Sequence, residues 1–147
     1  MTLLSTLFLG ANAFAADAVA GSWKLNAAMS KFSGPAAKSI TRVYKETAEG
    51  TSLEQKTVGA DGKEMSMHVT IKYDGKDHQV TGNPDADAVA GKLLDAHTAH
   101  FTMKRGGKEV GTVHRVVSAD GKTLTANNIG THADGKPYDD TLVFDRQ

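Results

Sequence analysis

The sequence contains no cysteine, and only 3 of its 147 residues are proline. The absence of cysteine excludes a disulfide scaffold, a thiolate metal site and a cysteine nucleophile. An excess of basic charge is also missing, because 17 Lys and Arg balance 17 Asp and Glu. Nucleic acid and anionic membranes attract proteins through such an excess. We therefore expect neither of them as the main partner of this protein.

Long hydrophobic runs are missing except near the N-terminus, where residues 3–14 are almost entirely apolar or small. The run ends in Ala13-Phe14-Ala15, a small-x-small pattern that predicts a signal peptide over residues 1–15. It is too short to span a bilayer, which needs ~20 apolar residues, so no membrane insertion is expected. No basic residue precedes the run, and a buried N-terminal helix is the alternative. The signal peptide predicts a periplasmic or secreted protein with one domain over residues 16–147.

Helical periodicity is absent from the rest of the chain, which is divided by turn signals instead. Asp-Gly-Lys occurs at residues 61–63, 74–76, 120–122 and 134–136, and Gly106-Gly107 adds a further turn. These dipeptides are typical of type I′ hairpin turns, in which both central residues have positive φ. The segments between the turns are rich in Val, Thr, Ile, Tyr and Phe and alternate with period two, as strands do.

The turns and the alternating segments together predict ten strands. They are expected near residues 20–26, 38–48, 51–59, 64–73, 76–82, 90–95, 98–105, 108–118, 122–132 and 137–146. Consecutive hairpins without a crossover helix form a meander, and a long meander hides its edges best by closing on itself. The predicted fold class is all-β, an antiparallel up-and-down β-barrel of eight to ten strands.

Tight two-residue turns also predict which side chains face inward, because pairing can be counted outward from each turn. The Gly-Gly turn places Met103 opposite Val110, and the last Asp-Gly turn places Asn127 opposite Leu142. The Asp-Gly turn between them places His114 opposite Asn127. The predicted ligand-binding residues on this face are Phe101, Met103, His114, Asn127, Tyr138, Asp140 and Phe144. Such a mixed lining is typical of a ligand cavity; polar groups that meet water at the barrel ends are the alternative.

The first predicted strand carries a family resemblance. It opens with Gly21-Ser22-Trp23, and a Gly-x-Trp at the start of a hairpin-built chain of this length resembles the lipocalins and the wider calycin superfamily. In that family the Trp closes the bottom of the barrel and a basic residue near the end of the last strand packs over it. Arg146 stands at that place. The resemblance therefore implies barrel closure by Trp23 and Arg146.

Two further segments, residues 24–33 and 73–76, are similar to secreted bacterial proteins of lipocalin-like type. Barrels of this superfamily include both binding proteins and enzymes, so the resemblance does not decide between these two functions. It leaves two barrel types open, the eight-stranded lipocalin type and the ten-stranded fatty-acid-binding-protein type.

The six histidines raise the question of a metal or haem site. Only His78 and His114 point inward by the predicted register, and these two are the candidate metal or haem ligands. A histidine that is hydrogen-bonded in the barrel wall is the other interpretation. We predict no cofactor, with a metal or haem as the alternative.

Patterns for nucleophilic or nucleotide chemistry are absent, since the chain has no Gly-x-Ser-x-Gly, phosphate-loop or Rossmann glycine pattern. His114 and Asp140 share the predicted inner face and are the candidate catalytic acid–base pair. The leading prediction is an exported, soluble protein that binds a small apolar or amphipathic molecule inside its barrel. The alternatives are an enzyme that uses His114 and Asp140, and a structural envelope protein with a filled barrel.

Overall fold

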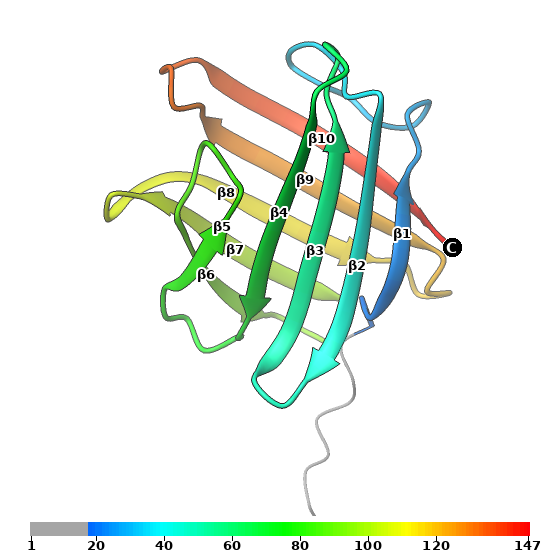
Figure 1. Ribbon diagram of the computed structural model, residues 1–147. Helices are drawn as coiled ribbons and strands as arrows, with labels where there is room; N and C mark the ends of the chain where they lie inside the picture. Colours follow the sequence, from blue (N-terminus) through cyan, green and yellow to red (C-terminus); the bar gives the residue numbers. More distant parts are fainter. Residues whose placement is uncertain (1–17) are drawn as a thin grey trace, which may run out of the picture.

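The computed structural model describes residues 18–147, which form ten antiparallel strands (Figure 1). The strands are β1 (Gly21–Leu25), β2 (Ser39–Thr47), β3 (Gly50–Val58), β4 (Glu64–Ile71), β5 (His78–Thr81), β6 (Ala88–Leu93), β7 (Thr98–Arg105), β8 (Lys108–Val117), β9 (Thr123–Thr131) and β10 (Pro137–Arg146). Each strand pairs with the next one, and β1 pairs with β10. The predicted up-and-down barrel is confirmed. The predicted signal peptide, residues 1–15, lies outside the described residues.

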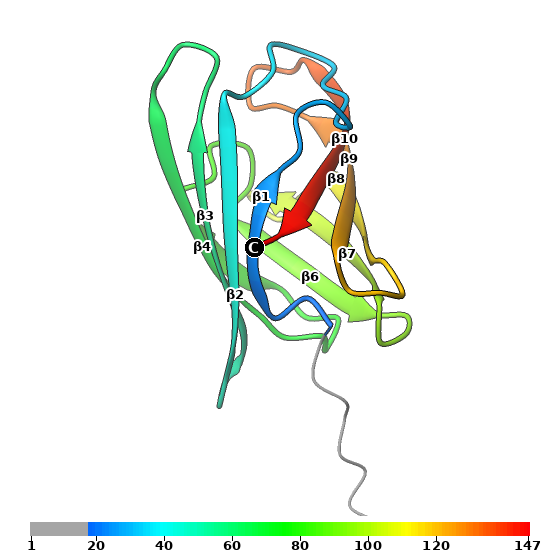
Figure 2. The ribbon, with the colours of Figure 1, turned by 90° about the vertical axis from the view of Figure 1, so that its right-hand side faces the viewer.

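The barrel has two broad walls, β2 to β4 on one side and β7 to β10 on the other (Figure 2). The seam around β5 is short, because only residue pairs such as Val69–Val80 and His78–Val89 join this strand to β4 and β6. Within residues 18–147, no helix is long and apolar enough to cross a membrane.

The four Asp-Gly-Lys segments share one local structure, which differs from the predicted type I′ turn. In each, the Asp carboxylate accepts a hydrogen bond from the N–H of the Lys two positions later, at 2.9–3.0 Å. Their glycines have positive φ, but no other residue type between 18 and 147 does. A type I′ turn needs two positive φ values, so these are Asx turns in other loop types. Gly106 and Gly107, at φ 58° and 81°, do form the predicted kind of turn.

A β-bulge at Val110 in β8, opposite Met103 and Lys104 of β7, reverses the predicted orientation of the rest of β8. The Gly-Gly turn pairs Arg105 with Lys108 as the count from the turn requires, but the register shifts between Met103 and Lys104. Met103 consequently lies opposite Gly111 and not opposite Val110. A shift of one residue moves every side chain of a strand to the other face.

The β9–β10 turn likewise places the side chains of β9 on the faces opposite to those predicted. Its loop holds three residues, since the backbone N–H of His132 donates to the carbonyl of Lys136 at 2.8 Å. Asn127 therefore lies opposite Thr141 and not opposite Leu142. His114 and Asn127 still face each other across β8 and β9, but they do so on the outside of the barrel.

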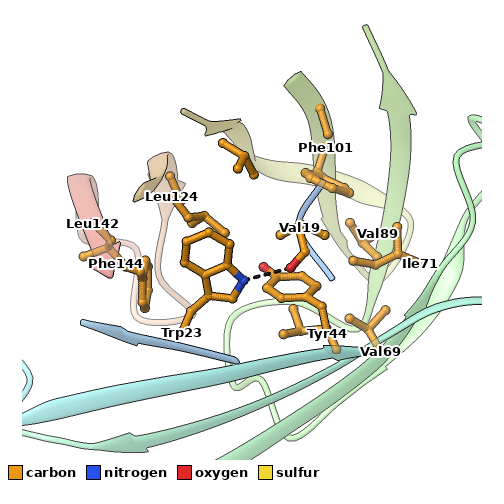
Figure 3. Packing of buried hydrophobic residues seen from close by; sticks show 14 of the residues in the cluster. Val19, Trp23, Tyr44, Val69, Ile71, Val89, Phe101, Leu124, Leu142 and Phe144 are labelled. Atoms are coloured by element: carbon orange, nitrogen blue, oxygen red, sulfur yellow. Dashed lines mark hydrogen bonds between the residues drawn. The ribbon is translucent and has the colours of Figure 1, made fainter. Parts of the chain in front are cut away.

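One end of the barrel is closed by a buried apolar cluster around Trp23. The largest fully buried side chains are Trp23, Phe144, Leu124, Val19 and Val117. The indole N–H donates a hydrogen bond to the carbonyl of Val19 at 2.8 Å (Figure 3). The only tryptophan of the chain is thereby held by packing and by its one polar group.

Arg146 covers this cluster from outside and ties four segments together. Its guanidinium lies 4.2 Å from the centre of the Trp23 ring. Its N–H groups donate to the carbonyls of Ala18, Ala20 and Gly121 at 2.6–2.7 Å. Gly21 makes room for it, because a Cβ at Gly21 would lie 2.5 Å from the guanidinium and the backbone there has φ +128°. The Gly-x-Trp pattern thus has a physical explanation: glycine admits the arginine and tryptophan receives it.

Candidate functional site

A cavity of about 240 Å³ lies inside the barrel, beyond the Trp23 cluster. Its wall is largely apolar, with contributions such as Leu53, Val69, Ile71, Val80 and Val89. Polar side chains gather at two places along it: two arginines near the buried cluster, and a group that includes Asp85, His132 and Asp140 near the loops. An apolar cavity with a few placed polar groups is the usual form of a small-molecule site.

Arg115 on β8 is the most deeply buried charged residue of the cavity wall, at 3% exposure. Its guanidinium lies over the rings of Tyr44, Tyr73 and Phe101, 5.2–5.8 Å from their centres. It also donates a hydrogen bond to the hydroxyl of Tyr73 at 2.8 Å. The negative faces of three aromatic rings therefore surround the cation and offset part of the cost of burying it.

Arg42 on β2 is the second buried arginine, at 8% exposure. Its Nε donates to Oε1 of Gln55 at 2.8 Å, and its guanidinium lies 4.4 Å from the centre of the Phe144 ring. Its Nη1 lies 3.4 Å from the hydroxyl of Tyr44, whose ring Arg115 also covers. Among residues 18–147, no Asp or Glu forms an ion pair with Arg42. The two guanidiniums and Tyr44 form the cationic floor of the cavity.

Two glycines shape the opposite end of the wall. Gly111 on β8 and Gly130 on β9 are cross-strand partners, and a Cβ on either would lie 2.7 Å from the hydroxyl of Tyr138. The pair therefore leaves the space in which the Tyr138 side chain crosses from β10 over β9. Its hydroxyl lies beside acidic groups: burial first, and then the charges of Asp85 and Asp140, raise the pKa of Tyr138.

Asp85 joins two loops at the mouth of the cavity. One carboxylate oxygen lies 2.7 Å from Nδ1 of His132, and the other accepts the backbone N–H of Ala133 at 2.9 Å. The His132 ring packs on Tyr138, 4.6 Å between ring centres. Arg105 donates to the backbone carbonyl of Asp85 at 2.7 Å. The β5–β6 loop is thus fastened to the β9–β10 turn beside the cavity.

Asp140 is the second carboxylate of the mouth. Its Oδ1 accepts hydrogen bonds from both the backbone N–H and the hydroxyl of Ser33, each at 2.7 Å. Ser33 belongs to the segment between β1 and β2, which Lys31 also joins to β10 through a bridge with Thr141. This segment therefore fixes the carboxylate at the edge of the cavity.

The chain matches no protein-family model and no curated protein.

The structure divides the predicted ligand-binding residues between two faces. Phe101, Met103, Tyr138 and Asp140 line the cavity. Phe144 lies in the closed end below Arg42. His114 and Asn127 are on the outer face, so their predicted place in the lining was wrong; the bulge and the three-residue turn described above are the reason.

The predicted catalytic pair is also separated. His114 is exposed on the outside of β8 while Asp140 lies on the inside of β10, so the two cannot act on one substrate. The candidate metal ligands are apart as well. His78 shares a face with the buried Val89 and bonds the Asp74 carboxylate at 2.9 Å, whereas His114 lies on the outer face of β8. Over residues 18–147, no group of three or more His, Cys, Asp or Glu side chains is arranged to hold a metal ion.

The arginines are the functional candidates that the sequence prediction missed. The predicted register put Arg115 on the outer face, and Arg42 lies in a strand for which no inner face was predicted. One signal was present: Arg42 alternates with Ile40 and Tyr44 along β2, and all three are buried. The side chains on the other face of β2, with Val43 at their centre, have a composition that fits an inner face equally well.

Proposed function

We propose that this protein binds a small amphipathic molecule with an acidic head group, and that the head group lies at the cationic floor. The observation that carries the proposal is the burial of Arg42 and Arg115 in one cavity wall, 8% and 3% exposed. Burying the charge of Arg42 costs free energy that its contacts with Gln55, Tyr44 and the Phe144 ring offset only in part. A carboxylate would offset it more fully, because guanidinium matches carboxylate geometry with two parallel hydrogen bonds.

The rest of the cavity suits the apolar part of such a ligand. Between the floor and the mouth the wall is formed by aliphatic and aromatic side chains, including Val69, Val89 and Phe101. The cavity volume of about 240 Å³ lies just below the ~300–1,000 Å³ that is usual for ligand pockets. A short-chain amphiphile fits this volume better than a long-chain lipid. The volume itself supports ligand binding over a filled, purely structural barrel.

The proposal includes the barrel type and the compartment. Gly21, Trp23 and Arg146 support a calycin-like barrel, and the ten strands agree with the fatty-acid-binding-protein type within that superfamily. The apolar run that ends at Ala15 supports export of the protein to the periplasm or the medium.

The test is calorimetric titration of the delipidated protein with octanoate. We expect saturable binding to the wild type and a loss of about tenfold or more in Arg115→Met, because hydrogen bonds to charged groups contribute ~1.5–3 kcal/mol. Lys45→Met is the matched control, since it removes one positive charge from the exposed face of the same barrel. Equal binding by all three proteins would refute the proposal. Native mass spectrometry of protein from its own host would identify a retained ligand.

A further inference from the structure

We infer that the cavity holds its ligand in one direction and selects acids that carry a hydrogen-bond donor, an amine or a hydroxyl, at the end opposite the acidic head. This inference rests on the proposed function, because it takes the acid to lie at the cationic floor. It adds a second recognition site, at the mouth of the cavity, for the far end of the same molecule.

The two ends of the cavity carry opposite charge. Arg42 lies over Phe144 at the floor, and Asp140 lies on the same face of β10, four residues nearer the mouth. Strands rise by ~3.3 Å per residue, so the two levels are about 13 Å apart along the wall. Asp85 adds a second carboxylate at the mouth.

Asp140 is the group that would meet the far end of a ligand. Its Oδ1 accepts two hydrogen bonds from Ser33, which orient the carboxylate but leave its charge in place. Among the described residues, no Lys, Arg or His forms an ion pair with Asp140. Its second oxygen accepts none of the hydrogen bonds found between residues 18 and 147. A carboxylate that is held in place and lines a cavity is a good acceptor for an ammonium or hydroxyl group.

The other acidic group of the mouth acts in the same direction, and Arg105, which binds the backbone carbonyl of Asp85, opposes it in part. Both oxygens of Asp85 are engaged, by His132 and by the N–H of Ala133, so this carboxylate contributes charge without a free oxygen. Burial, and then the negative charges of Asp85 and Asp140, raise the pKa of the Tyr138 hydroxyl. Asn128 brings a neutral amide into the same part of the wall. A negatively charged ligand end would be repelled here and a donor attracted.

The experiment compares four probes of one chain length: octanoate, 8-hydroxyoctanoate, 8-aminooctanoate and octylamine. An eight-carbon chain matches the cavity volume, and its extended length is similar to the distance between floor and mouth. We expect 8-aminooctanoate to bind about tenfold more tightly than octanoate, with the hydroxy acid between them, because charge-assisted hydrogen bonds are the stronger ones. Octylamine lacks the acid and should bind the most weakly.

The variant that tests the mouth is Asp140→Asn, which keeps an oxygen for Ser33 and removes the charge. It should lower the advantage of 8-aminooctanoate over octanoate to about twofold or less and leave octanoate binding unchanged or tighter. Asp139→Asn is the matched control, because Asp139 is the exposed neighbour on the outer face of the same strand. It should retain the full advantage.

Each outcome separates the two proposals. Equal binding of octanoate and 8-aminooctanoate by the wild type would overturn the donor selectivity and leave the acid-binding function standing. Absence of binding by all three acids would refute the proposed function and this inference with it. Octylamine binding as tight as that of 8-aminooctanoate would overturn the orientation, since the acid would then contribute nothing. These comparisons use the wild-type protein and do not depend on the folding of a variant.

Discussion

Arg115 is held at 3% exposure by three aromatic rings and a tyrosine hydroxyl. Such a residue has two explanations that differ in their effect on stability. A structural arginine would stabilise the fold, whereas an arginine kept for a ligand costs stability when the ligand is absent. The three rings and the Tyr73 hydroxyl keep the guanidinium in one orientation, as the proposed contact with an acidic head group requires.

We predict that Arg115→Met lowers the free energy of unfolding of the ligand-free protein, because the Tyr73 hydroxyl and three aromatic rings lose the guanidinium that they contact. Urea denaturation of the two ligand-free proteins measures the difference. An unchanged or raised free energy of unfolding would show that Arg115 does not stabilise the fold.

Trp23 and Arg146 form the other important residue pair, and we predict that they act on stability together. Trp23→Ala should cost ~3–5 kcal/mol, the usual range for a buried large aromatic residue, and Arg146→Ala should cost less. Because the guanidinium lies 4.2 Å from the indole ring centre, the double variant should lose less than the two single losses added together. Denaturant titrations of all four proteins complete the cycle, and strict additivity would contradict the closure role.

At the scale of the element, the strands could be predicted from the sequence, but the inner faces of β8 and β9 were predicted wrongly and β2 was given none. Period-two alternation and Asp-Gly or Gly-Gly turns marked ten segments, and all ten are strands. The faces failed because Asp-Gly occurs in loops of different length, and because the bulge at Val110 leaves no mark in the sequence. β10 was placed correctly, since Tyr138, Leu142 and Phe144 alternate along it and face inward.

This limit explains which residues of the candidate site could be predicted from the sequence. Phe101, Met103, Tyr138 and Asp140 lie on strands β7 and β10, whose faces were predicted correctly. The prediction placed His114 in the cavity lining, where the structure has its neighbour Arg115. The reason is that a shift of one residue exchanges the two faces of a strand. Composition could not resolve the ambiguity, since both faces of β8 carry Val residues around one basic side chain.

The turns offer a direct test of backbone strain. We predict that Gly121→Ala costs ~1–2 kcal/mol, because its backbone has φ +72° and a left-handed conformation disfavours any Cβ. Nothing lies within 4 Å of a Cβ built there, so contacts contribute nothing to the loss. Gly34→Ala is the control, with equally open space and no such φ, and should stay within ~0.5 kcal/mol of the wild type. Thermal unfolding distinguishes the two; equal stabilities would contradict the strain argument.

The Asx turn at Asp120 should also depend on pH. The hydroxyl of Ser118 and then the backbone N–H of Lys122 donate to its carboxylate and lower the pKa of Asp120 below the ordinary 3.8. A lowered pKa means that the turn gains stability above the ordinary value and loses it as pH falls through the folded-state pKa. Carboxyl NMR titration should show this pKa rising toward 3.8 in Ser118→Ala. An unchanged titration would show that the hydroxyl does not hold the carboxylate in solution.

At the scale of the whole molecule, the zero net charge of the sequence conceals a separation of charge inside the barrel. The floor carries Arg42 and Arg115 and the mouth carries Asp85 and Asp140, so the overall charge does not describe the cavity. Composition has no means of showing such a local cationic site.

We predict that the exported protein begins at Ala16. Cleavage after Ala15 keeps the carbonyls of Ala18, Val19 and Ala20, which accept hydrogen bonds from Arg146 and Trp23. N-terminal sequencing of the periplasmic or secreted fraction checks the position. An intact Met1 on protein from the cytosol would contradict export, and a start beyond residue 20 would contradict the closure of the barrel by this segment.

The hydrogen bond between Arg146 and Ala20 joins residues 126 positions apart, and this spacing has a consequence in time. A ribosome adds about 5–20 residues per second, so β1 waits roughly 6–25 s for the strand that completes it. Until then Trp23 has no guanidinium over it and the barrel remains open along one seam. The emerging chain is thus kept from closing its barrel until the last strand has been made.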